Sequence, residues 1–458
     1  MIKLWNVYYP TRTVVLILCE AMIVGGSFVL ASALVLGPNT FVVLGHNRAI
    51  TKILIITVST ILCAYYFDLY EPQHISTRWE IYIRLLLVIG SLAFALSALV
   101  YVFPDVVIAR YVFLLGLILV VTSLFVWRCA FEWISGHAIF QERVYVLGEG
   151  ERASSIIETI HTHREAGMVV VGWNTPPADK SERKRIFTAA VEHMTAVKPS
   201  IDRIVIALDE RRGELPVDGL LSMRLHGIAI EEVGSVLERL TGKLQLEGLH
   251  PSDLLFCEGF RMKPSQQVAL RTASTLVAAI VLTLFLPIFP IVILLVRCSS
   301  PGPIFFRQQR VGLNGRIFTI YKFRTMVADA EAGGAKWATK NDPRVTRIGQ
   351  FMRKTRLDEV PQLWNVLRGD MSFVGPRPER PEFVSWLSEE IPFYDVRTMI
   401  RPGLTGWAQI RYGYGATLAE SREKLAYDLY YVKHQTLGLD LLIIFETIKT
   451  IIRRRGAQ

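Results

Sequence analysis

The chain has 458 residues, 51% of them hydrophobic, with a mean hydropathy of +0.33. This composition excludes an ordinary soluble protein for at least part of the chain, and the length allows about three domains. The formal net charge of +10 favours a partner that carries phosphate, although anionic lipid, nucleotide and nucleic acid all satisfy it. The five cysteines form no Cys-x-x-Cys pair, so neither a disulfide framework nor a zinc site is predicted.

Residues 1–135 predict a bundle of four transmembrane helices. The apolar runs are 14–36, 53–66, 81–103 and 107–127. A helix needs roughly 20 apolar residues to cross the hydrocarbon core, so the second run is close to the minimum. Four crossings return the chain to its starting side, which we expect to be the cytoplasm. The charged residues within the runs, Glu20, Arg84 and Arg110, lie near their ends, so the bundle predicts a membrane anchor rather than a transporter.

Residues 136–260 predict a Rossmann-like α/β domain. Apolar strands are expected at 144–148, 168–173, 204–207 and 228–232, alternating with helical patterns. The turn from Gly148 to Ala153 has the Gly-x-Gly-x-x-Ala spacing that can hold a dinucleotide pyrophosphate. However, Glu149 and Glu151 would repel phosphate, and no acidic residue ends the second strand. We therefore favour a structural or regulatory domain over a nucleotide-binding one.

Residues 261–458 begin with a fifth apolar run, 276–296, which contains Pro287 and Pro290. Proline inside a helix removes a hydrogen bond and bends the chain. The cations that follow the run are Arg307, Arg310, Arg316, Lys322 and Arg324. A full crossing would place them outside the cell, against the positive-inside bias. We therefore predict a re-entrant helix over about residues 268–296, which dips into the membrane and returns on the same side.

Cations alternate with apolar residues in the predicted strand that contains Lys322 and Arg324. A charged run is usually a solvated surface, but this alternation indicates a partly buried anion site. Arginine side chains match the geometry of phosphate, so phosphate is the expected ligand.

The adjacent carboxylates Asp358 and Glu359 are the main catalytic candidates. Followed by Pro361, the pair resembles the start of a helix, where acidic residues usually do no more than cap. The arginines that lie close in sequence are Arg353, Arg356, Arg368 and Arg377. These cations favour an ionised Asp358, as a nucleophile requires, and a second carboxylate beside it can hold Mg²⁺.

Long ordered motifs resemble those of the bacterial sugar transferases, and more narrowly the monotopic polyprenyl-phosphate phosphoglycosyl transferases. The matching stretches are 322–326, 357–372, 375–379, 401–409 and 428–432. The resemblance is specific over about residues 271–453. The large initiating members of this family have a similar layout, with four helices, a middle domain and then a transferase domain. A re-entrant membrane helix in an α/β catalytic domain is therefore expected.

The resemblance implies a two-step reaction, in which Asp358 attacks the sugar-bearing phosphate of a UDP-sugar and releases UMP. Undecaprenyl phosphate then accepts the phosphosugar. Asp358 and Glu359 are expected to bind Mg²⁺, and Arg353 to meet the polyprenol phosphate. The remaining assignments are Lys322, Arg324 and Arg377 to substrate phosphates, Gln362, Asn365 and Arg401 to other substrate contacts, and Pro287 to the helix break. Glucose is the expected sugar, with galactose and N-acetylated sugars left open.

The expected location is the cytoplasmic face of the bacterial inner membrane, where the product would initiate exopolysaccharide or another surface glycan. Membrane lipids are expected partners, nucleic acid is not, and a homodimer is compatible with the sequence. Two alternatives stay open: direct transfer in a ternary complex, with Asp358 and Glu359 only as metal ligands, and a non-catalytic membrane scaffold or regulator. The final stretch, 441–455, predicts either an interfacial helix or one packed on the catalytic core.

Overall fold

The structure is a computed structural model. It describes residues 1–4, 6–40, 49–71, 78–102, 110–135, 141–148, 150–174, 201–208, 215, 217–247, 249, 251–256, 259–327, 342–413 and 417–453. The chain divides into two compact units, Met1–Ile2 with Tyr8–Val236, and Lys3–Val7 with Leu237–Gln458. The domain limits at residues 135 and 260 stay predictions.

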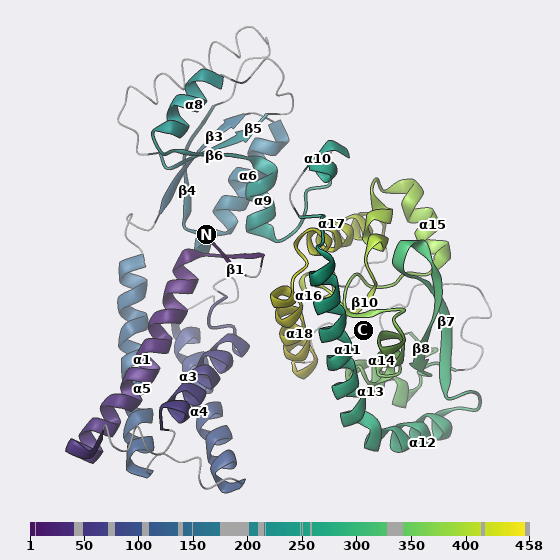
Figure 1. The fold of residues 1–458 in the computed structure, drawn as a ribbon, viewed down its shortest axis with the longest axis horizontal. Coiled ribbons are helices and arrows are strands. Elements are labelled where there is room, and N and C mark those ends of the chain that lie inside the picture. Colours follow the sequence, from purple (N-terminus) through teal and green to yellow (C-terminus); the bar gives the residue numbers. More distant parts are fainter. Residues whose placement is uncertain are drawn as a thin grey trace. The chain divides into compact units, whose positions relative to one another are not determined.

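The first unit contains the apolar helices of the N-terminal part (Figure 1). Its helices are α1 (Thr11–Leu36), η1 (Gly37–Asn39), α3 (Ala49–Tyr66), α4 (Arg78–Val102) and α5 (Arg110–Ser135). They are preceded in the chain by the short strands β1 (Ile2–Leu4) and β2 (Val7–Tyr9), whose residues are divided between the two units. The four predicted runs therefore form helices. In the described part of the chain, α1, α3, Tyr111–Ile134 of α5 and the later stretch Pro264–Ser299 are long and apolar enough to cross a membrane. This supports membrane association.

Charged groups inside the helical bundle are paired. Glu20 of α1 forms a buried ion pair with Arg128 of α5 and accepts a 2.6 Å hydrogen bond from the hydroxyl of Tyr70. The other end of the Arg128 guanidinium donates to the carbonyl of Leu69 at 3.0 Å. Pairing removes most of the cost of burying a charge in an apolar bundle. The cluster therefore fits a stable anchor.

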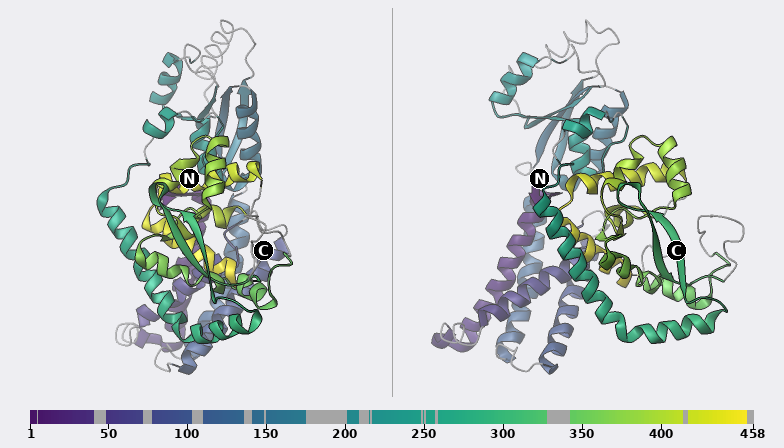
Figure 2. Two further views of the ribbon diagram at one scale, coloured as in Figure 1. Left: turned by 90° about the vertical axis from the view of Figure 1, so that its right-hand side faces the viewer. Right: turned by 45° about the vertical axis from the view of Figure 1, so that its right-hand side comes forward.

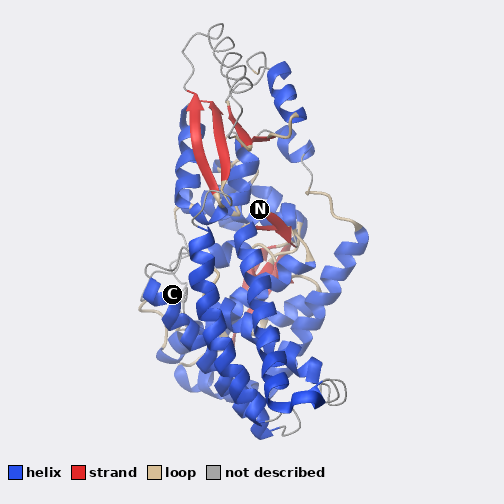
Figure 3. Ribbon diagram, turned by 90° about the vertical axis from the view of Figure 1, so that its left-hand side faces the viewer, coloured by secondary structure: helices blue, strands red, loops and turns tan. Residues whose placement is uncertain are grey.

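The α/β part of the first unit has a four-stranded parallel sheet in the order β4-β3-β5-β6. Figure 3 shows these strands in red, with helices beside them. Its elements are β3 (Glu142–Gly148), α6 (Gly150–Thr162), η5 (Arg164–Ala166), β4 (Met168–Asn174), β5 (Arg203–Ala207), α8 (Val217–Leu225), β6 (Ala229–Glu232) and α9 (Val233–Thr241). All four predicted strands are present, and the apolar residues of the two central strands, β3 and β5, are buried, whereas Val169, Val171 and Trp173 of the edge strand β4 are exposed.

The glycine turn after β3 has a packing explanation. A Cβ atom on Gly148 would lie 2.3 Å from the carbonyl oxygen of Ala207, so only glycine permits this approach to β5. Glu149, one of the two acidic residues of the turn, lies outside the described residues. A structural reason for Gly148 thus exists without a nucleotide.

The second unit is entered by α10 (Pro251–Phe256) and contains the bent apolar segment. Helix α11 (Pro264–Phe285) is followed by a 3₁₀ turn, η6 (Leu286–Ile288), and by α12 (Phe289–Ser299). Figure 2 shows the chain turning sharply between α11 and α12. Pro287 lies in the turn, so the predicted helix break is where proline interrupts the hydrogen bonds.

Most of the remaining elements of the second unit lie in the angle between α11 and α12, whereas α18 (Leu437–Ile452) lies on the other side of α11 in the view of Figure 1 (Figures 1 and 2). The elements between α12 and α18 are β7 (Phe305–Val311), η7 (Leu313–Gly315), β8 (Ile317–Phe323), α13 (Arg347–Lys354), η8 (Leu357–Glu359), α14 (Gln362–Arg368), β9 (Ser372–Val374), α15 (Pro381–Glu390), η9 (Tyr394–Met399), β10 (Gly403–Thr405), α16 (Trp407–Arg411) and α17 (Leu418–His434). An antiparallel pair, β7–β8, and a parallel pair, β9–β10, form its sheets. It is therefore a mixed α/β unit.

Helix α18 corresponds to the amphipathic stretch at the end of the sequence. Leu439 and Ile443 are fully buried on one face, whereas Leu441, Ile448 and Ile452 are exposed on the other. The helix therefore packs on the second unit and still presents an apolar surface, so the two expectations for it are compatible. Residues 454 and 455 lie outside the described part of the chain.

Candidate active site

The carboxylate pair lies in a short 3₁₀ turn rather than at the start of a helix. Asp358 and Glu359 belong to η8, and α14 begins three residues after Glu359, with Pro361 at its N-cap position and no capping side chain. The pair therefore resembles the start of a helix in sequence, but neither carboxylate caps α14. Arg356, directly before η8, has a left-handed backbone with φ 57°, which costs free energy for a residue other than glycine. This strained residue turns the chain so that both carboxylates point inward and are buried.

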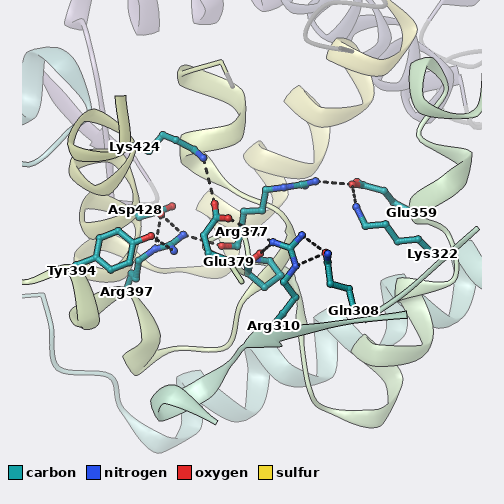
Figure 4. Close-up of polar contacts among 11 residues, drawn as sticks. Gln308, Arg310, Lys322, Glu359, Arg377, Glu379, Tyr394, Arg397, Lys424 and Asp428 are labelled. Carbon is teal, nitrogen blue, oxygen red and sulfur yellow. Dashed lines mark hydrogen bonds and ion pairs between the residues drawn. The ribbon is translucent and has the colours of Figure 1, made fainter. Parts of the chain in front are cut away.

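Glu359 is held by cations from separate elements. Its Oε1 atom accepts from Lys322 Nζ at 3.0 Å and from an Arg377 terminal nitrogen at 2.8 Å (Figure 4). Its Oε2 atom lies 3.8 Å from Arg356. Burial alone would raise the pKa of Glu359, but Arg377, Lys322 and Arg356 hold this pKa well below its usual range. Glu359 is therefore a permanent anion.

Asp358 is buried but unpaired, since no hydrogen bond or ion pair reaches its carboxylate from the residues that the structure describes. Burial and the adjacent charge of Glu359 raise the pKa of Asp358 to about 6, against the opposing effect of Lys322, Arg353 and Arg356. The cations lower the pKa of Asp358, as expected, but burial outweighs them. Near pH 7 the group is still mostly ionised, poorly solvated and available to react.

Lys322 reaches Glu359 because β8 is fixed to α14. Asn365 of α14 donates to the carbonyl of Thr319 at 2.8 Å and accepts from the backbone N–H of Tyr321 at 3.3 Å. Asn365 is completely buried and also contacts Asp370. These contacts leave no exposed surface for a substrate, so Asn365 positions the strand that carries Lys322 instead of binding substrate.

Arg377 is fixed by a second buried group of charges (Figure 4). Its carbonyl accepts from Arg397 at 2.8 Å, and Arg397 forms a buried ion pair with Asp428 at 2.8 Å. Glu379, two residues along, lies 3.5 Å from Lys424. Arg310, Arg397, Lys424 and Asp428 were not among the sequence-predicted site residues. The spacing of Lys424 and Asp428, four residues apart on one helical face of α17, is the signal that could have revealed them.

Unsatisfied donors lie on other predicted residues. Arg324 donates to the carbonyl of Ser300 at 2.5 Å, while its Nε and one terminal nitrogen are buried and have no acceptor among the described residues. The side-chain nitrogen of Gln362, the first residue of α14, is also buried and has no partner in the described part of the chain. Arg353 donates to Thr325 Oγ1 at 3.1 Å and acts on the charge of Asp358. Buried donors without acceptors are costly and are typical of sites that bind an anion.

Two arginines from the sequence analysis lie away from the pair. Arg401 donates to the carbonyl of Gly369 at 3.2 Å, and Arg368 is largely exposed beside Asp370. Both positions are at the C-terminal end of α14, whereas Asp358 and Glu359 precede its N-terminus. The structure therefore does not bring Arg368 or Arg401 to the carboxylates.

Comparison with known sequences gives a consistent result for the second unit. The sequence profile of the family described as "Bacterial sugar transferase" matches residues 265–454. A UDP-N-acetylgalactosamine-undecaprenyl-phosphate N-acetylgalactosaminephosphotransferase from Aeromonas hydrophila is 43% identical, over 51% of this chain and 55% of that protein. An undecaprenyl-phosphate glucose phosphotransferase from Komagataeibacter xylinus is 31% identical, over 74% of this chain and 65% of that protein. The chain thus matches a little more than half to about two thirds of these two proteins.

A third relative is similar over a larger share of its own length. A UDP-glucose:undecaprenyl-phosphate glucose-1-phosphate transferase from Caulobacter vibrioides is 41% identical, over 41% of this chain and 71% of that protein. The family match over residues 265–454 includes the part of the chain that carries Asp358, Glu359 and their cations.

Proposed function

Because the chain belongs to the bacterial sugar transferase family, we propose that it transfers a sugar 1-phosphate from a UDP-sugar to undecaprenyl phosphate, with Asp358 as the nucleophile. The observation that carries this proposal is the contrast within the pair. Glu359 is neutralised by Lys322 and Arg377, whereas Asp358 is buried and unpaired among the described residues. A carboxylate that is ionised and poorly solvated is a competent nucleophile.

In the first step an oxygen of Asp358 attacks the phosphorus that bears the sugar. A phosphorus–oxygen bond to Asp358 forms, the bond between the two phosphates breaks, and UMP leaves. In the second step an oxygen of undecaprenyl phosphate attacks the same phosphorus and displaces the Asp358 carboxylate. The product is undecaprenyl diphosphate sugar. Lys322, Arg353 and Arg377 supply the positive charge that the diphosphate requires.

The residues present fit a bound Mg²⁺. Asp358 is not engaged with another side chain of the described chain, and Glu359 Oε2 has only the distant contact to Arg356. Mg²⁺ in proteins is commonly held by one or two carboxylates together with substrate phosphates. Asp358 and Glu359 would hold it, and when bound it would neutralise charge on the diphosphate.

We also propose that the α11–α12 segment is re-entrant and that the second unit lies at the cytoplasmic face of the inner membrane. The 36 residues of this segment would span about 54 Å as one straight helix, well beyond a hydrocarbon core of about 30 Å. The break at Pro287 divides it into two shorter arms. Leu276 and Ile280 on α11 and Leu294 on α12 expose apolar side chains on both arms. We further propose that the α/β part of the first unit is a Rossmann-like domain in the cytoplasm.

Purified full-length protein without lipid acceptor tests the nucleophile. A burst of UMP equal to the amount of active enzyme, with a phosphosugar adduct on Asp358 found by mass spectrometry, is expected. Asp358→Asn should abolish both signals, whereas Asp395→Asn, at an exposed position, should keep them. UMP release that always requires undecaprenyl phosphate, without an adduct, would establish the ternary-complex alternative.

A panel of UDP-sugars tests the donor. The relatives carry glucose or N-acetylgalactosamine in their names, and we retain glucose as the expected sugar. Release of UMP from none of the panel, together with full glycan synthesis in cells that carry Asp358→Asn, would support the scaffold alternative and contradict the proposed function.

A further inference from the structure

Arg271 of α11 contacts the end of α14 opposite to the carboxylate pair. One terminal nitrogen of its guanidinium donates to the carbonyls of Val366 at 2.8 Å and Met371 at 3.2 Å. The other donates to the carbonyl of Leu367 at 3.2 Å. The last carbonyls of a helix lack partners within the helix and carry partial negative charge. Arg271 therefore caps α14 from outside.

The local backbone is shaped around this guanidinium. Gly369, just after α14, has a left-handed backbone with φ 101°, and a Cβ atom there would lie 3.1 Å from Arg271. One turn further along α11, Ser274 Oγ accepts from the backbone N–H of Phe373 at 2.6 Å. Two polar groups on one face of α11 thus hold the segment that runs from α14 into β9.

The same face of α11 packs against apolar side chains around the start of α14. Ala278 is fully buried in a cluster that includes Val360 and Leu363, which lie on either side of the start of α14. The opposite face of α11 exposes Leu276 and Ile280. α11 therefore connects an apolar surface suited to lipid with the segment that follows Asp358 and Glu359.

We infer that Arg271 is a positioning residue, which fixes α14 against the membrane helix and thereby holds Asp358 and Glu359 in register with Lys322. This inference rests on the proposed function. A shift of α14 would move η8 at its N-terminal end, and it would move β8 through the hydrogen bonds of Asn365. Since a misplacement of about 1 Å can cost about 100-fold in rate, a cap distant from the carboxylates can control catalysis.

The alternative for a cation near the end of a membrane helix is attraction to lipid headgroups, which needs only the positive charge. Lysine keeps that charge but cannot donate from two nitrogens to three carbonyls. Arg271→Lys therefore separates the two roles. Arg297→Gln is the matched control. Arg297 is exposed at the end of α12, and its substitution removes one cation from the same apolar segment.

The experiment measures UMP release by full-length protein in nanodiscs, with the active sites counted by the UMP burst. Arg271→Lys is expected to lower kcat about 10- to 100-fold while KM for the UDP-sugar changes less than about 3-fold. Arg297→Gln is expected to stay within about 2-fold of wild type. Full activity of Arg271→Lys would overturn the inference, whereas absence of UMP release from wild type would instead overturn the proposed function.

A second variant guards against simple misfolding. Ser274→Ala removes the acceptor for Phe373 N–H without removing charge, and it should lower kcat in the same direction while the thermal midpoint falls by only a few degrees. Arg271→Ala offers a further readout, because added methylguanidinium can refill the space beside Gly369. Recovery of kcat with methylguanidinium supports the positioning role. Wild-type kcat in Ser274→Ala together with no recovery in Arg271→Ala would contradict it.

Discussion

Lys322 Nζ lies 3.0 Å from Glu359 Oε1, and this buried ion pair joins strand β8 to the turn that carries Asp358. The same oxygen also accepts from Arg377. Glu359 thus organises two of the cations that the diphosphate requires, while the neighbouring Asp358 stays unpaired within the described chain. The two carboxylates therefore lie in different environments, one paired with cations and the other buried without a partner among the described residues.

We predict that Glu359→Gln lowers kcat for UMP release by about 100-fold or more, because Lys322 and Arg377 lose their common anion and repel each other. The measurement is single-turnover UMP release with saturating UDP-sugar. The control is Glu382→Gln, which neutralises an exposed carboxylate in the first turn of α15. Equal rates in the two variants would show that Glu359 has no catalytic role.

We predict that Arg397→Met destabilises the second unit by about 3–5 kcal/mol, because it leaves Asp428 as an uncompensated buried group. Arg397 also holds the carbonyl of Arg377, so activity should fall as well. The measurement is denaturant unfolding of the purified protein. Arg422→Gln, at an exposed position of α17, should change stability by less than about 0.5 kcal/mol. A similar small change in Arg397→Met would contradict the prediction.

The stability of the second unit should depend on pH through Asp440. Burial raises the pKa of Asp440 to about 7, although the hydrogen bond from Tyr431 opposes this shift. An aspartate in an unfolded chain has a pKa of about 3.9, so between these values the folded state binds more protons. The stabilisation of the folded state by protonated Asp440 is fully present below about pH 4 and is lost as pH rises through about 7.

Thermal unfolding of wild type and Asp440→Asn at several pH values between 5 and 8 measures this effect. The thermal midpoint of wild type should fall more steeply with rising pH than that of the variant. Parallel curves for the two proteins would show that Asp440 does not titrate as described.

We predict that both ends of the α11–α12 segment face the same side of the membrane. Cys298 is exposed at the end of α12, and Ser265→Cys places a thiol at the beginning of α11. In a background without other cysteines, each thiol should react with a membrane-impermeant maleimide in inverted vesicles and not in intact spheroplasts. Opposite labelling of the two thiols would show a full crossing and contradict the re-entrant arrangement.

The sequence alone was enough to predict the apolar helices, the strands of the parallel sheet and a set of candidate site residues. Long apolar runs predict helices because a backbone in lipid must satisfy its own hydrogen bonds, which a helix does within the segment. Apolar segments bounded by turns predicted all four strands of the parallel sheet. The Asp358–Glu359 pair, Lys322 and Arg377 were identifiable because ordered motifs and local charge do not depend on long-range contacts. Pro287 was identifiable because proline cannot continue a helix.

Only the tertiary structure separated the roles of neighbouring residues. Whether Asp358 is paired or unpaired depends on which cations β8 and the Arg377 loop bring to η8, and that is set by packing between segments distant in sequence. The raised pKa of Asp358 likewise comes from burial, which no local pattern encodes. Asn365 and Arg271 act through hydrogen bonds to backbone groups, which leave no signature in side-chain type or spacing. The sequence therefore identified the candidate reactive groups, and the tertiary structure determined which of the two carboxylates is paired with cations.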